Sequence, residues 1–98
     1  MLRPLLSSLL LCLSSTISAA NIKAGEEIAA TVCSQCHGIK TPALETLNPV
    51  LAGRDARQLR IILQEYRNKT RISPLMNNLA GSLSDKDIAN ISEYYSGL

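Results

Sequence analysis

Cys33-Ser34-Gln35-Cys36-His37 is the stretch from which the fold of this chain is predicted. On one turn of helix, positions i, i+3 and i+4 share a face, so both thiols and the imidazole can meet one flat group. This spacing is the attachment sequence for a c-type haem. The two thiols would add to the haem vinyl groups as thioethers, and His37 would bind the iron as an axial ligand.

Other sites also use closely spaced cysteine and histidine. A thioredoxin-like redox pair needs a βαβ context, and no β-type alternation surrounds this stretch. A structural zinc site needs four ligands, whereas the chain has three Cys and one His, and Cys12 lies in a segment that we expect to be removed. A purely structural disulfide between Cys33 and Cys36 would leave His37 without a role. Haem attachment is therefore the favoured interpretation.

Residues 1–20 have the pattern of a secretory signal peptide. Arg3 supplies a positive n-region, Leu5 to Leu13 an apolar h-region, and Ser18-Ala19-Ala20 a small-residue cleavage site. A retained membrane anchor is less favoured, because the apolar run is shorter than the roughly 20 residues of a spanning helix. We expect cleavage after Ala20, a periplasmic protein, and no stable membrane insertion afterwards.

Residues 21–98 are then expected to form one domain with one covalently attached haem c. A chain this short has difficulty burying enough apolar surface unaided, and it contains no Phe, no Trp and only three Tyr. A buried haem would supply the missing apolar centre. The formal net charge of the whole chain is only +2, which argues against nucleic acid as a partner.

The sequence pattern predicts an all-α fold, with three main helices wrapped around the haem. The helices are expected at about residues 23–35, at 55–68, and from a capping box at Ser84 and Asp87 to near Gly97. The stretches 38–53 and 70–83 are expected to be loops, because prolines such as Pro49 and Pro74 interrupt helices. Met76 would lie in the second loop.

Three arginines of the predicted second helix, Arg57, Arg60 and Arg67, lie off its apolar stripe. A basic face of this kind is most often simply solvated. The alternative is that Arg57 and Arg60, with nearby Lys69, dock an acidic partner.

Met76 is the one methionine of residues 21–98. A lone methionine is more often core packing than a ligand. A haem bound only by His37, however, would leave an open position on the iron. A thioether in that position gives a six-coordinate iron suited to electron transfer and raises its reduction potential. The residues alone leave both interpretations of Met76 open.

The pattern resembles class I cytochromes c, in particular the small bacterial c553, c4 and c5 type. The matching pieces follow one another in order and cover nearly all of residues 21–98: 33–38, 49–53, 66–71, Met76, 83–88 and 94–96. This resemblance implies a small class I cytochrome c fold with His37 and Met76 as axial iron ligands. It also implies that the Pro49 carbonyl accepts a hydrogen bond from the His37 ring and orients it.

The resemblance further implies that the first and last helices cross closely, and Gly25 against Tyr94 is the expected contact. Two positions depart from the family pattern. Ala29 stands in the first helix where an aromatic residue is common, and Asn68-Lys69 replaces a glycine often seen after the position of Tyr66.

The expected function is that of a periplasmic monohaem electron carrier, which cycles between Fe(II) and Fe(III) and is not itself an enzyme. Its partners would be periplasmic or membrane-bound reductases and oxidases. One alternative is a cytochrome subunit of a larger periplasmic oxidoreductase. Another is a ligand-binding or sensory haem protein, which would require Met76 to be absent from the iron or labile.

Overall fold

The computed structural model describes residues 20–43 and 48–98, and the helices are the regular elements of this part of the chain. They are α1 (Ile22–Ile28), η1 (Ala29–Cys33), α2 (Ser34–His37), α3 (Ala56–Asn68), α4 (Pro74–Gly81) and α5 (Asp85–Ser96). The two described ranges contain no β-strand, so the expected all-α fold is confirmed. The expected signal peptide, apart from Ala20, lies outside the described residues.

Helices α1, η1 and α2 follow one another without a break from Ile22 to His37, slightly beyond the expected 23–35. Asn21 begins this segment, because its side chain accepts a hydrogen bond from the Ala24 N–H at 3.0 Å. The middle turn, η1, is a π-helix, which holds one more residue than an α-helical turn. This wider turn ends at Cys33, the first residue of the Cys-x-x-Cys-His stretch.

The α1 segment crosses α5 at a glycine. Gly25 is buried, and a Cβ at this position would collide with the backbone carbonyl of Asn90 and lie 3.0 Å from the Ile91 nitrogen. These nearest atoms belong to Asn90 and Ile91, about one turn of α5 before Tyr94, the residue expected at this contact. The glycine lets the two backbones touch, which no larger residue would permit.

The apolar core lies where η1, α3 and α5 meet. Its buried members are Ala29, Leu59, Ile91 and Tyr95. Ala29 is fully buried within this cluster, so the departure from the aromatic residue common in the family leaves a small side chain in the core.

Caps fix the beginnings of α3 and α5. The Asp55 side chain accepts from the Gln58 N–H at 3.2 Å. At α5 the capping box is complete, since Ser84 and Asp87 each accept a 3.0 Å hydrogen bond from the other's backbone N–H. The predicted bounds of both helices are confirmed within one or two residues.

The arginines of α3 do not all meet the expectation of a solvated face. Arg67 pairs with Asp85 at 2.6 Å and Arg60 lies 3.6 Å from Glu93. Both acidic partners are on α5, so these two arginines tie α3 to α5, while Arg57 is exposed. The Arg60 side chain stays 36% exposed, so the expectation of a solvated face is wrong only for Arg67, whose side chain is 25% exposed and also donates to the Leu83 carbonyl at 3.2 Å.

Residues 74–81 form helix α4, which corrects the expected loop at 70–83. Pro74 occupies the first helical position, where a missing N–H costs nothing and the fixed φ suits the helix. Met76 therefore lies in the first turn of a helix.

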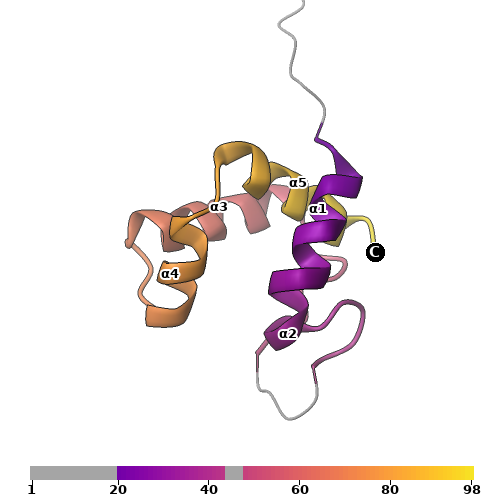
Figure 1. Ribbon diagram of the computed structural model, residues 1–98, viewed down its shortest axis with the longest axis horizontal. Helices are drawn as coiled ribbons and strands as arrows, with labels where there is room; N and C mark the ends of the chain where they lie inside the picture. The colour runs from indigo at the N-terminus through magenta and orange to yellow at the C-terminus, as the bar shows by residue number, and fades with distance from the viewer. Residues whose placement is uncertain (1–19, 44–47) are drawn as a thin grey trace, which may run out of the picture.

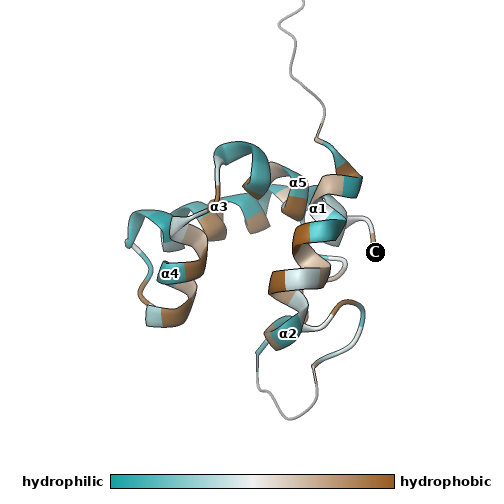
Figure 2. Cartoon of the chain, in the orientation of Figure 1, coloured by the Kyte–Doolittle hydropathy of each residue, from teal (hydrophilic) through white to brown (hydrophobic). Residues whose placement is uncertain are grey.

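Figure 1 shows an arch. The continuous segment from α1 to α2 forms one leg, α4 forms the other, and α3 and α5 join them. Helices α1, α3, α4 and α5 each carry both teal and brown segments in Figure 2, as amphipathic helices around a shared interior should. Within the described residues, no helix has the length and apolarity needed to cross a membrane.

Candidate functional site

A cavity of about 330 Å³ lies on the inner side of the arch. Its volume falls in the range of small-molecule and cofactor sites. The lining side chains are mostly apolar. The apolar ones come from α1, η1, α3, α4, α5 and two connections: Ile28, Val32, Leu51, Leu59, Ile62, Leu63, Leu75, Leu79, Ala80, Leu83 and Ile91.

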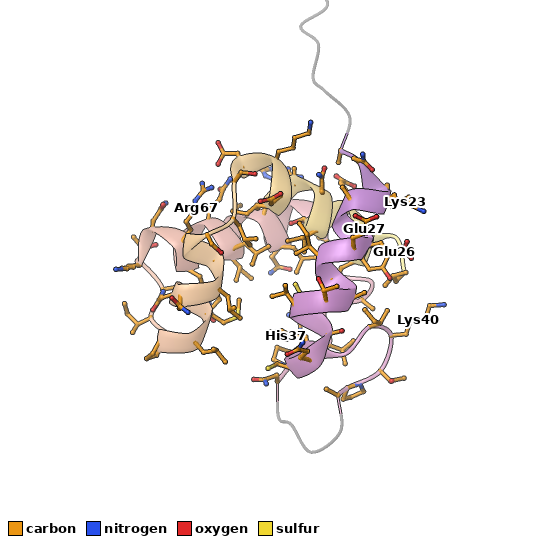
Figure 3. The ribbon with its side chains drawn as sticks, in the orientation of Figure 1. Lys23, Glu26, Glu27, His37, Lys40 and Arg67 are labelled. Atoms are coloured by element: carbon orange, nitrogen blue, oxygen red, sulfur yellow. The ribbon has the colours of Figure 1, made fainter. Side chains whose placement is uncertain are left out.

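The structure brings the expected site residues to this one cavity. Cys33, Cys36 and His37 line it from η1 and α2, and Met76 lines it from α4. The imidazole and the thioether thus come from the two opposite legs of the arch. Figure 3 shows His37 at the end of the α1–α2 leg, away from Lys23 and Glu27, which project from the other end of that leg.

The His37 ring is held by the backbone. Its Nδ1 lies 2.8 Å from the carbonyl oxygen of Pro49. A carbonyl oxygen can only accept a hydrogen bond, so Nδ1 carries the proton and donates the hydrogen bond. In the neutral ring Nε2 then carries a lone pair, which is the state that binds a metal ion.

Gly38 ends the helix directly after His37. Its φ of +70° lies in the left-handed region, and a Cβ there would collide with the Thr41 carbonyl. The buried hydroxyl of Tyr95 donates to the Gly38 carbonyl at 3.2 Å. The last helix therefore holds the end of the Cys-x-x-Cys-His turn in place.

The Cys33 thiol points into this same apolar region. Burial raises its pKa, and hydrogen bonds from its own backbone and from Tyr95 oppose that shift without cancelling it. Burial likewise raises the pKa of the Tyr95 phenol, with the nearby Cys33 adding to the effect. Both groups are neutral at pH 7, which suits an apolar cavity.

Sequence reasoning missed several polar residues around the cavity. Arg54 lines it and donates from Nε to the Val50 carbonyl at 2.9 Å. Arg71 also lines it, paired with Glu65 at 3.1 Å. Tyr95 lies in the matching piece 94–96, but no local signal predicts the hydrogen bond from its hydroxyl to the Gly38 carbonyl. The positions of these residues depend on contacts between segments distant in sequence, which no local motif signals.

The rival interpretations gain no support from this arrangement. Within the described ranges, no three or more His, Cys, Asp or Glu side chains converge to hold a metal ion. The described residues also lack the βαβ unit of a thioredoxin-like pair. Two thiols at the required spacing, a lone-pair nitrogen and a thioether in one apolar cavity fit a covalently bound haem.

Residues 20–94 match the family model described as cytochrome c oxidase, cbb3-type, subunit III. The chain belongs to the cytochrome c family. This cytochrome c is 38% identical over 81 residues to cytochrome c-554(548) of Halomonas halodenitrificans, covering 80% of the chain and 96% of that relative. It is 36% identical over 93 residues to cytochrome c4 of Pseudomonas aeruginosa, covering 93% of the chain and 46% of that relative.

A solved structure agrees with these relatives. Cytochrome c4 of Acidithiobacillus ferrooxidans matches with a TM-score of 0.73 and 29% identity, over 87% of this chain and 54% of that chain. The chain thus spans nearly all of the c-554(548) relative but only about half of either cytochrome c4. The expected small class I cytochrome c fold is confirmed. The family is one of electron-transfer proteins that carry a covalently bound haem c.

Proposed function

We propose that this cytochrome c is a periplasmic one-electron carrier with one haem c per chain. Cys33 and Cys36 would attach the haem, and His37 and Met76 would be the axial ligands of its iron. The observation that carries the proposal is that these four side chains, from opposite legs of the arch, line a single apolar cavity.

A haem bound in this cavity would supply the Fe(II)/Fe(III) couple. The chain's own residues would set its properties. The Pro49 carbonyl, 2.8 Å from Nδ1 of His37, fixes the ring orientation and makes Nε2 a stronger donor. The Met76 thioether is soft and neutral, which favours Fe(II) and a high potential. Arg54 at the cavity wall would offset the negative charge of the haem carboxylates.

The proposed periplasmic location and the proposed partner surface are supported by different features of the chain. Residues 1–20 have the pattern of a secretory signal, which supports a periplasmic protein. Ile72 and Leu75 are 75% and 56% exposed, and Leu75 also lines the cavity. Exposed apolar residues next to the redox site would meet the partner during electron transfer.

A second candidate function is that of a cytochrome subunit in a larger periplasmic oxidoreductase. The matched family is described by an oxidase subunit, and one relative from Stutzerimonas stutzeri is named thiosulfate dehydrogenase electron acceptor. That relative is 35% identical over 65 residues, which is 30% of its own length. In this case the exposed Ile72 and Leu75 would be covered by a permanent partner, and the native protein would purify as a complex.

The test of the carrier proposal is the ligation state of the iron. Wild-type holoprotein should show a six-coordinate, low-spin spectrum when oxidised and reduced, and the reduced form should bind carbon monoxide slowly. Met76→Ala should lose the sulfur-to-iron charge-transfer band, become partly high-spin, bind carbon monoxide readily and have a lower potential. Leu79→Ala, on the same helix and lining the same cavity, is the control that should keep the band.

The contrary result is equally clear. If wild type already binds carbon monoxide quickly and Met76→Ala changes neither the spectrum nor the potential, Met76 is a packing residue. The protein would then be a ligand-binding or sensory haem protein.

A further inference from the structure

The side-chain amide of Asn77, the residue after Met76, satisfies both of its donor hydrogens and its oxygen. Nδ2 donates to the Tyr66 carbonyl and to the Arg71 carbonyl, both at 2.8 Å. Oδ1 accepts from the Ser73 N–H at 3.0 Å. One amide therefore joins the end of α3, the connection after it and the start of α4.

The connection that Asn77 holds has an unfavourable backbone. Lys69 has a φ of +65°, in the left-handed region that favours glycine. The chain turns back because the Thr70 and Arg71 N–H groups both donate to the Glu65 carbonyl, at 3.0 and 3.2 Å. A turn without a glycine needs such contacts to persist.

The first turn of α4 has little else to hold it. Ser73 provides no side-chain cap for the first N–H groups of α4. The Asn77 oxygen instead accepts a hydrogen bond from the Ser73 N–H, which ties the residue before α4 to the start of the helix. Pro74 and Leu75 are exposed, and the buried residue of α4 is Ala80, more than a turn beyond Met76. Apolar packing therefore fixes the end of α4 better than the turn that carries Met76.

We propose that Asn77 is a positioning residue, which keeps the Met76 thioether in the cavity and slows its replacement on the iron by outside ligands. This inference rests on the proposed function, since it takes Met76 to be an axial ligand. The amide acts by closing the 66–73 connection over the turn that carries Met76. When its hydrogen bonds open, that turn and the thioether can swing away from the cavity.

The test compares Asn77→Ala with two controls in the reduced holoprotein. Asn78→Ala removes an amide that is exposed on the same helix and makes no side-chain hydrogen bond among the described residues. Ser84→Ala removes the cap of α5 and weakens the fold away from Met76. Asn77→Ala loses all three of these hydrogen bonds and should bind carbon monoxide at least about tenfold faster than wild type, since the net contribution of one such bond can already reach that factor. Its oxidised form should show a weaker sulfur-to-iron band. Both controls should match wild type.

Asn77→Ser is the second variant, since a short polar side chain at this position should still allow the holoprotein to form. It should give an intermediate rate. The proposal is overturned if Asn77→Ala and Asn77→Ser bind carbon monoxide at the wild-type rate, or if Ser84→Ala accelerates binding equally, because the effect would then be one of general stability.

The proposal also fails if neither Asn77 variant yields holoprotein while both controls do, since the amide would then be needed to form the fold and not to position one side chain. Failure of the underlying function looks different. In that case Met76→Ala itself leaves the spectrum unchanged, whereas every failure of this inference leaves the spectral change of Met76→Ala intact.

Discussion

Replacing Gly25 with alanine places a methyl group directly against the backbone of α5, where Asn90 passes. The opposing atoms belong to a helix backbone and cannot rotate away, so the two helices must separate. Overpacking of this kind costs about 1–3 kcal/mol, and the upper end applies when the obstacle is backbone. Alanine in a helix gains about 1 kcal/mol over glycine. The net expectation is a loss of about 2 kcal/mol, and for a domain of this size roughly 10 °C in Tm.

The assay is thermal and guanidinium unfolding of the holoprotein, followed by far-ultraviolet circular dichroism. Gly81→Ala is the matched control, because Gly81 lies in α4 and a methyl group there would meet no other segment of the described chain within 4 Å. That variant should be as stable as wild type or gain up to about 1 kcal/mol. If Gly25→Ala were as stable as Gly81→Ala, the close crossing of α1 and α5 would not exist in solution.

Three further predictions concern attachment, pH and docking. Replacing Cys33 and Cys36 together with alanine should leave a chain that releases all haem in acid-acetone, whereas wild type should retain it. Burial raises the pKa of Tyr95, so above about pH 10 the folded state keeps a phenol proton that the unfolded state loses. The free energy of unfolding, measured by denaturant titration, should therefore fall as pH rises beyond that value, and it should fall less steeply in Tyr95→Phe than in wild type. Arg57→Glu should slow electron transfer with an acidic partner at low salt without moving the potential, and the difference should shrink at 0.10–0.15 M salt, where charges are screened beyond about 8–10 Å. Lys23→Glu, at the end of the α1–α2 leg away from His37, is the control, and an equal effect of both reversals would mean that no specific basic face exists.

Much of the fold was predictable because its signals are local. Asp55 and Ser84 are caps that stand next to the helices they begin, so both bounds followed from the sequence. The prediction of a loop at 70–83, where the structure has helix α4, was wrong because its local signal is ambiguous. Pro74 breaks a helix in its interior and begins one at its first position, and the residue alone does not distinguish the two cases.

The contacts between helices were less predictable. The α5 face that meets Gly25 was predicted, since Asn90 and Tyr94 are one turn apart on the same face of the helix. The position along α5 at which the two helices cross depends on how closely the two backbones approach. The pairing of Arg60 with Glu93 depends on the same geometry. The residues of the Cys-x-x-Cys-His stretch, by contrast, are neighbours in sequence and needed no such information.

Asn77 shows the limit most clearly for the candidate site. Two of its partners are backbone carbonyls, at Tyr66 and Arg71, and backbone carbonyls carry no residue-specific signal. Met76 stood out because it is the one thioether of residues 21–98. The amide beside it is one of many in the chain, and only the path of the 66–73 connection gives it a function.

The π-helical turn Ala29–Cys33 determines how far one face of the first helical segment is rotated relative to another about the helix axis. Each residue of an α-helix advances by about 100° around the axis, and a π turn absorbs one residue more than an α turn does. The face that crosses α5 at Gly25 and the face that presents Cys36 and His37 are therefore offset by that extra residue. Removing one residue from this turn would rotate the second face by about 100° while leaving every residue of the attachment stretch unchanged. A transplant of the stretch into another helix would need residues 25–38 as a unit. The orientation of Cys36 and His37 relative to Gly25 depends on the number of residues between them.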